Sequence, residues 1–171
     1  MYLTLVIAHT GQGKTTFCKK MIEGKPCLVF DVNNEYDLEA VEDNPDGERT
    51  RDTNLDMGVF VGFCSEAVFN KIVIIEDATG FFRGNMSGEF IRMIQRKRHS
   101  NNNYVLLFHS IASVPRQIFD FVNYVILFNT NDNEDIVKKK YPALLPHYLK
   151  LKKEAKKYNK KILCFNYRYY F

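Results

Sequence analysis

Residues 8–16 read AHTGQGKTT, and this segment is the strongest indication of the fold class. It matches the Walker A pattern G-x-x-x-x-G-K-[ST], with Ala8 in place of the first glycine. Gly11 and Gly13 allow the backbone to turn its N–H groups inward around phosphate oxygens. An apolar run before the loop predicts a buried strand, and the segment after it predicts a helix that ends near Gly24. This strand–loop–helix setting is the one the motif requires, and it weighs against a glycine-rich turn that merely contains Lys-Thr.

The residues of this loop have expected roles in binding a nucleotide. Lys14 is placed to reach the β- and γ-phosphates, and the Thr15 hydroxyl is placed to ligate Mg²⁺. The helix that follows presents the positive end of its dipole to the same anion. The expected cofactors are therefore ATP and Mg²⁺. The expected nucleotide-binding residues are His9, Thr10, Gly11, Gln12, Gly13, Lys14, Thr15 and Thr16.

A pair of acidic residues ends the most apolar predicted strand, KIVIIED at 71–77. In a parallel sheet the carboxyl ends of such strands lie at the same edge as the phosphate loop. By position, Glu76 holds the metal and Asp77 orients or deprotonates the attacking water. In ATPases with a Walker A loop the usual order is Asp then Glu. The opposite assignment, with Asp77 on the metal and Glu76 on the water, therefore stays open. The alternative is an acid pair that simply faces solvent.

A histidine ends another apolar strand, YVLLFHS at 104–110. His109 would lie between the phosphate loop and the acid pair, where it could sense the γ-phosphate. The alternative is a structural histidine, since the side chain alone does not define a role.

Strands alternate with helices along the whole chain, and the predicted strands are apolar on both faces. This pattern predicts an α/β fold with a mostly parallel central sheet and helices on both faces. No composition shift marks a linker, so we expect a single domain over 1–171. Within it, 31–58 holds ten acids and predicts a surface excursion. GVFVGF at 58–63 predicts an extra short strand, and 149–160 a basic helix.

The composition excludes several classes of protein. The 171 residues are 46% hydrophobic and 14% aromatic, so the chain is not disordered as a whole. No apolar run approaches a membrane span, and the N-terminus lacks a secretory signal. The four cysteines are scattered, which is typical of reduced thiols. These features together predict an intracellular protein.

Charge is divided unevenly along the chain. Residues 1–137 carry 13 Lys and Arg against 19 Asp and Glu, whereas 138–171 carry 11 against one. This basic C-terminal helix and strand could bind a polyanionic partner, or could be a solvated surface. The candidate nucleic-acid-binding residues are Lys152, Lys153, Lys156 and Lys157.

Several segments together resemble the HerA/FtsK superfamily of P-loop ATPases, particularly the small genome-packaging ATPases of tailless viruses and phages. They are AHTGQGKTT, FDVNNEY at 30–36, KIVIIEDA at 71–78 and RKRHSNNNYVLLFHSIASVPRQIFDFVNYVILF at 96–128. The resemblance implies a RecA-like (ASCE) sheet. In it the sensor strand, which ends at His109, separates the Walker A strand before the phosphate loop from the Walker B strand, which ends at Glu76 and Asp77. It also implies a homo-oligomeric ring, usually a hexamer, with ATP at the subunit interfaces. An arginine, Arg98 or alternatively Arg96, would complete the neighbouring subunit's site. His109 stands where the family has Gln.

The function implied by this resemblance is Mg-ATP-dependent DNA translocation that packages a viral or phage genome. Its partners would be double-stranded DNA and a capsid or portal-vertex protein, and its expected location is the host cell cytoplasm or the virion. Zonular-occludens-toxin-like phage assembly ATPases share similar motifs and form an alternative. A small P-loop kinase acting on a nucleotide or metabolite, and a nucleotide-binding assembly factor without hydrolysis, stay open as well.

Overall fold

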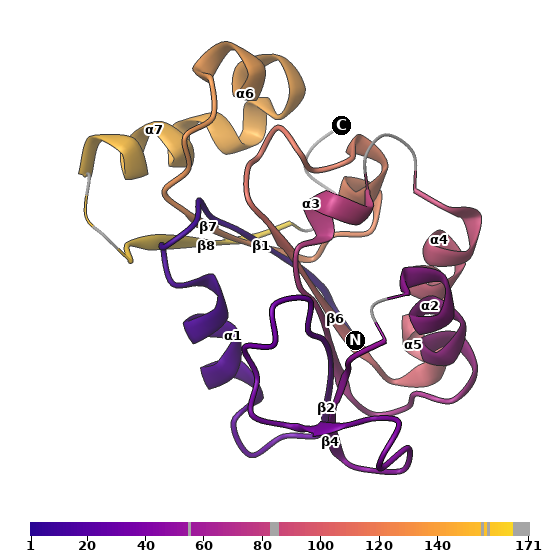
Figure 1. Ribbon diagram of the computed structural model, residues 1–171. Helices are drawn as coiled ribbons and strands as arrows, with labels where there is room; N and C mark the ends of the chain where they lie inside the picture. The colour runs from indigo at the N-terminus through magenta and orange to yellow at the C-terminus, as the bar shows by residue number, and fades with distance from the viewer. Residues whose placement is uncertain (55, 83–85, 155, 157, 166–171) are drawn as a thin grey trace.

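The computed structural model describes residues 1–54, 56–82, 86–154, 156 and 158–165. Within these residues, eight strands form one sheet in the order β3-β4-β2-β5-β6-β1-β7-β8 (Figure 1). The strands are β1 (Leu3–Ile7), β2 (Cys27–Phe30), β3 (Glu39–Ala40), β4 (Arg49–Asp52), β5 (Ile72–Ile75), β6 (Asn103–Phe108), β7 (Tyr124–Phe128) and β8 (Lys160–Cys164). The α-helices are α1 (Lys14–Ile22), α2 (Met57–Glu66), α3 (Ala78–Phe81), α4 (Gly88–Gln95), α5 (Lys97–Ser100), α6 (Glu134–Lys140) and α7 (Leu145–Glu154). Two short 3₁₀ helices are η1 (Arg116–Asp120) and η2 (Pro142–Leu144).

The sheet is mostly parallel, which confirms the predicted fold class. All neighbouring pairs from β3 to β7 are parallel, and β8 pairs antiparallel with β7 at one edge. Strand β6 lies between β1 and β5. The strand that ends before His109 therefore separates the strand before the phosphate loop from the strand before the acid pair, as the family resemblance implies.

Helices cover both faces of the sheet, and the central strands are accordingly apolar on both faces. On one face, Cys18 and Ile22 of α1 pack in a cluster with Val6, Val29 and Leu107. On the other face, buried residues of α2, α4 and α7 join the larger cluster of the core. Figure 1 shows α1 on one side of the sheet and α2 and α4 on the opposite side. The predicted layers are confirmed.

The predicted strand at 58–63 is wrong, because this segment belongs to helix α2. The Asp56 side chain caps the helix by accepting hydrogen bonds from the N–H groups of Gly58 and Val59. Phe60 and Cys64 are buried four residues apart, on the helix face that meets the core. The cap and the helical spacing outweigh the strand preference of the Val and Phe residues.

The acidic segment 31–58 contributes to the sheet as well as to the surface. It contains β3 and β4, and β4 continues the parallel sheet beside β2. The basic helix is displaced from its predicted range, since α7 ends at Glu154. Residues 160–164 form the last strand, and 166–171 of the predicted C-terminal strand lie outside the described residues. No helix in the described part of the chain is long and apolar enough to cross a membrane.

Candidate functional site

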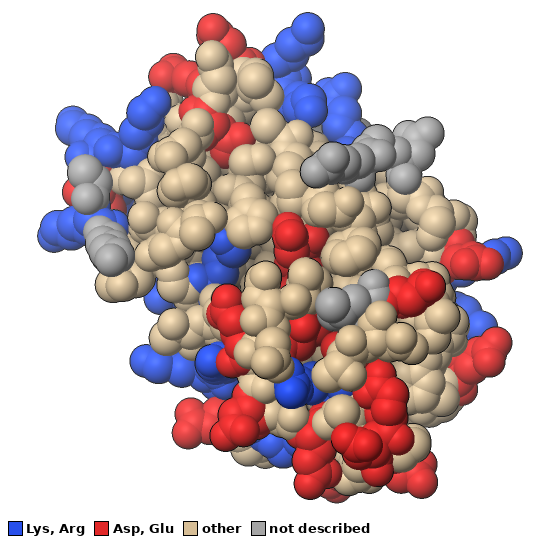
Figure 2. All heavy atoms as spheres, viewed as in Figure 1, with Lys and Arg blue, Asp and Glu red and all other residues tan. Residues whose placement is uncertain are grey.

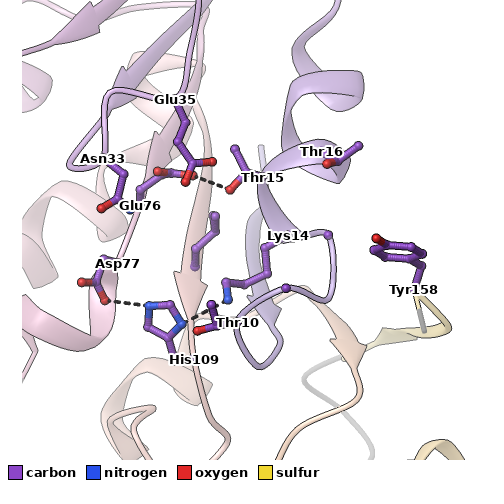
Figure 3. A pocket seen from close by; sticks show the side chains of 13 residues that line it. Thr10, Lys14, Thr15, Thr16, Asn33, Glu35, Glu76, Asp77, His109 and Tyr158 are labelled. Atoms are coloured by element: carbon purple, nitrogen blue, oxygen red, sulfur yellow. Dashed lines mark hydrogen bonds and ion pairs between the residues drawn. The ribbon is translucent and has the colours of Figure 1, made fainter. Parts of the chain in front are cut away.

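The phosphate loop, the acid pair and the predicted sensor meet in one cavity of about 350 Å³ at the carboxyl ends of the parallel strands. The loop follows β1, Glu76 and Asp77 follow β5, and His109 follows β6. Strand order places these three ends side by side, so segments far apart in sequence converge (Figure 3). The described residues that line the cavity are Thr10, Gly11, Gly13, Lys14, Thr15, Thr16, Asn33, Glu35, Glu76, Asp77, Leu107, His109 and Tyr158.

The backbone of the loop depends on its two glycines. Gly11 and Gly13 have φ angles of +80° and +84°, a left-handed conformation that side chains with a Cβ rarely adopt. Gly13 is also the residue before the first turn of α1, and it has no side chain to occupy the first N–H groups of that helix. These N–H donors and the positive end of the helix dipole are therefore available to an anion.

Lys14 is held by two acceptors inside the loop. Its Nζ donates to the carbonyl oxygen of Ala8 at 2.7 Å and to Nδ1 of His109 at 3.1 Å. Burial lowers the pKa of this lysine, while the neighbouring Glu76 and Asp77 act in the opposite direction. Both acceptors can be replaced by phosphate oxygens, so the ammonium is already positioned where a bound triphosphate would lie.

His109 connects Lys14 to Asp77. An ammonium has no acceptor, so Nδ1 of His109 must accept from Lys14. The proton of the neutral ring is then on Nε2, which donates to Oδ1 of Asp77 at 3.2 Å. Burial, followed by the charge of Lys14, lowers the pKa of His109. The backbone N–H of His109 donates to the Thr79 hydroxyl of α3 at 3.1 Å, which helps to fix the ring at this position.

Glu76 is 2% exposed and lies at the bottom of the site. Its Oε1 accepts hydrogen bonds from the hydroxyls of Thr15 and Tyr36, both at 3.2 Å. Its Oε2 is buried and has no hydrogen-bond partner among the described residues. Burial, with a smaller contribution from the Glu35 charge, raises the pKa of Glu76 to about 7. A buried carboxylate with a free oxygen is stabilised when a cation binds beside it.

These residues fit a magnesium ion of the kind that P-loop proteins bind with a nucleotide. Thr15 and Glu76 supply oxygen atoms, the ligands Mg²⁺ prefers, at the end of the loop where the phosphates would lie. No group of three or more His, Cys, Asp or Glu side chains in the described ranges could hold a metal by itself. This donor set suits Mg²⁺, which keeps waters and uses substrate phosphates as further ligands.

The segment FDVNNEY forms the wall of the site, which the residue-by-residue interpretation of the sequence missed. Asp31 follows β2 and is buried; its carboxylate accepts from the backbone N–H groups of Glu35 and Tyr36 at 2.9 and 3.0 Å. An ion pair with Arg51 of β4 at 3.3 Å holds Asp31 in turn. This turn positions Glu35 at the cavity and the Tyr36 hydroxyl on Glu76. The signal that could have identified this segment as part of the site is its position at the end of a buried strand.

Other predicted site residues lie elsewhere. His9 and Gln12 belong to the phosphate loop and do not line the cavity. Arg98 in α5 and Arg96 before it are exposed, and they precede β6 at the amino end of the strands, opposite the cavity. Three of the candidate DNA-binding lysines, at the end of α7 and after it, are exposed, and the fourth falls outside the described residues. The three exposed residues are Lys152, Lys153 and Lys156, and the residue outside the described part of the chain is Lys157.

Comparisons with solved structures identify the fold. The genome packaging NTPase B204 of Sulfolobus turreted icosahedral virus 2, in complex with sulfate, matches with a TM-score of 0.77 and 14% identity over 96% of this chain and 92% of that chain. The same protein in complex with ATP-gammaS matches with a TM-score of 0.76 and 14% identity over 95% and 92%. The N-terminal domain of zonular occludens toxin from Neisseria meningitidis gives 0.53 and 14% over 76% and 78%. No family model and no curated protein sequence matches the chain.

The neighbours are the two kinds of protein that the sequence resembles, a viral genome-packaging NTPase and a zonular occludens toxin domain. At these identities the likeness establishes the fold. The P-loop NTPase fold predicted from the sequence is therefore confirmed.

Proposed function

We propose that this chain, which has the fold of a P-loop NTPase, hydrolyses Mg-ATP to move DNA and so packages a viral or phage genome. The observation that carries the proposal is the convergence of Lys14, Thr15, Glu76, Asp77 and His109 on one cavity. The likeness to a genome packaging NTPase over nearly the whole of both chains supports the biological role.

In this proposal each residue has a defined part in the reaction. Lys14 leaves the Ala8 carbonyl and binds the β- and γ-phosphates, while the loop N–H groups surround them. Thr15 and Glu76 would hold Mg²⁺, which neutralises charge on the phosphates when it is bound. Asp77, with His109 hydrogen-bonded to it, orients the attacking water and accepts its proton. Phosphoryl transfer depends mainly on such positioning and charge stabilisation.

The charge distribution supports nucleic-acid binding at one end of the molecule. Figure 2 shows Lys and Arg gathered where α6 and α7 lie, and Asp and Glu gathered at the opposite end around β4. The last turns of α6 and α7 are rich in lysine, and these side chains are exposed. An exposed lysine surface binds the phosphates of double-stranded DNA without reading its sequence.

Any catalytic role of Arg98 or Arg96 would be at the site of a neighbouring subunit. Both lie at the end of the sheet opposite the cavity. A neighbouring copy, in a ring that is usually a hexamer in this superfamily, could present one of them to the γ-phosphate. The remaining partner in this proposal is a capsid or portal-vertex protein.

The experiment that tests this function is Mg²⁺-dependent ATP turnover with and without double-stranded DNA. We expect turnover that DNA stimulates and that Lys14→Ala abolishes. Lys20→Ala, which removes an exposed lysine from the same helix, should behave like the wild type. Phosphate transfer to a nucleotide or metabolite would instead indicate a kinase. Tight ATP binding without turnover would indicate a nucleotide-binding assembly factor, an alternative consistent with the Glu76–Asp77 order and with His109.

A further inference from the structure

We propose that Tyr158 forms the base-binding end of this site by stacking on the nucleobase of the bound nucleotide. The inference rests on the function proposed above and adds a subsite to it. Tyr158 lies in the segment between α7 and β8 and was not singled out from the sequence.

The direction of the cavity determines where the base would lie. Asp77 and His109 mark the γ-phosphate end, because they are the groups placed to act on water and the terminal phosphate. Residues Gly13 to Thr16 also line the cavity, and they would surround the phosphates nearer the sugar. Figure 3 shows Tyr158 on the far side of the loop from Asp77 and His109. The ribose and base of a nucleotide bound in this direction would therefore emerge beside Tyr158.

The position of the tyrosine ring suits stacking. The ring lies against the loop, since a Cβ placed on Gly13 would be 3.0 Å from Cδ1 of Tyr158. Tyr158 is nevertheless 56% exposed, so much of the side chain is accessible to a ligand. Among the described residues that line the cavity, Tyr158 is the one with an aromatic side chain of the Phe, Tyr or Trp type. Aromatic rings stack on any nucleobase, because every base has a π-face.

The backbone conformation of Tyr158 is unusual, and contacts of Lys160 hold the chain just after it. Its φ angle is +65°, in the left-handed region that bulky side chains rarely adopt. Two residues later, the Lys160 ammonium lies 5.4 Å from the Phe17 ring centroid on α1 and 5.7 Å from that of Phe128 on β7. These cation–π contacts fix the start of β8 beside the phosphate loop. The fold thus keeps an exposed ring at this place despite an unfavourable backbone conformation.

Calorimetric binding of two probes, Mg-ATP and tripolyphosphate, separates the base from the phosphates. We expect Tyr158→Ala to weaken ATP binding about tenfold and to leave tripolyphosphate binding unchanged. Tyr158→Phe keeps the ring and should bind ATP like the wild type. Tyr2→Ala removes a tyrosine that is also half exposed but far along the chain, and serves as the matched control.

A fluorescent variant provides a second readout. The chain contains no Trp, so Tyr158→Trp introduces a single indole whose emission should change with ATP and not with tripolyphosphate. An equal loss of affinity for both probes in Tyr158→Ala would overturn the proposal, because the ring would then only support the loop. Unchanged ATP affinity would overturn it as well. Failure of the wild type to bind tripolyphosphate would instead overturn the proposed phosphate site itself.

Discussion

The ammonium of Lys14 and the imidazole of His109 are hydrogen-bonded, with Nζ 3.1 Å from Nδ1, although 95 residues separate them in the chain. Lys14 donates this hydrogen bond, and the ring donates a second one from Nε2 to Oδ1 of Asp77. A nucleotide that draws Lys14 onto its phosphates would break this contact and leave Nδ1 free to accept another hydrogen bond. The Lys14 side chain of the loop is thus connected through His109 to Asp77, the residue proposed to activate water, before any ligand binds.

The titration of His109 tests this connection directly. Lys14 lowers the pKa of His109 and Asp77 raises it, so the two variants should move it in opposite directions. Lys14→Ala should raise the pKa, because it removes a nearby positive charge, and Asp77→Asn should lower it. NMR of the ring protons measures both shifts. Lys20→Ala should leave the titration as in the wild type, and a shift of the same sign in both variants would contradict the geometry.

The pH dependence of stability should reveal the buried carboxyl of Glu76. The folded chain keeps the proton up to about pH 7, whereas an unfolded chain loses it near 4.5. The folded state therefore binds more protons within this window, and stability should fall as the pH rises through it. Above pH 7 and in the absence of a cation, ionisation of Glu76 lowers the free energy of unfolding by about 3 kcal/mol.

Thermal unfolding of Glu76→Gln measures this cost. The variant should unfold at a higher temperature than the wild type at pH 8, and at about the same temperature below pH 4.5. Added Mg²⁺ and ATP should reduce the difference at pH 8, because they stabilise the wild-type carboxylate. A difference that does not change with pH would show that the Glu76 carboxyl is not responsible.

The acid pair should divide its roles by position. Asp77→Asn should bind Mg-ATP normally but turn it over about 100-fold more slowly, since it loses the group that accepts a proton from water. Glu76→Gln should instead reduce the Mg²⁺ dependence of ATP binding. Titration calorimetry and steady-state turnover separate the two effects. The reverse pair of phenotypes would show that the roles follow the residue type.

An arginine acting across a subunit boundary predicts recovery on mixing. Arg98→Ala and Lys14→Ala should each be inactive alone, because every interface in a ring of one variant lacks a necessary group. A mixture should regain part of the turnover at interfaces that combine an intact Lys14 with an intact Arg98. The same mixture with Arg96→Ala tests the alternative arginine. No recovery in assembled mixtures of either kind would favour a structural role for both.

The exposed lysines of the C-terminal segment should set the salt dependence of DNA binding. Replacing Lys152, Lys153 and Lys156 with Gln should weaken binding to all sequences alike and reduce the slope of log affinity against log salt by up to about 0.9 per lysine. Thermal stability should hardly change, because exposed charges contribute little to it. The matched control replaces three lysines at the other end of the chain, Lys19, Lys20 and Lys25. An unchanged slope in the first variant would place the DNA path elsewhere.

Much of the fold could be predicted because its signals are local. The loop motif, the apolar strands and the acid pair each occupy a few consecutive residues, and their chemistry allows few conformations. The strand predicted at 58–63 was wrong because a short apolar run fits a buried helix as well as a strand, and the Asp56 cap decided between them.

The loop at 8–16 could be predicted from its residues alone, because left-handed backbone at positions 11 and 13 favours glycine. The sequence also determined that Glu76, Asp77 and His109 end buried strands, since apolar runs stop at these positions. The other side chains of the site are brought there by contacts between distant parts of the chain. Tyr36 reaches Glu76 because β2 lies beside β5, and Tyr158 reaches Gly13 because β8 adds to the sheet beyond β7. The family resemblance implied that β6 lies between β1 and β5, but the places of β2 and β8 depend on contacts between distant segments that no local pattern of residues encodes.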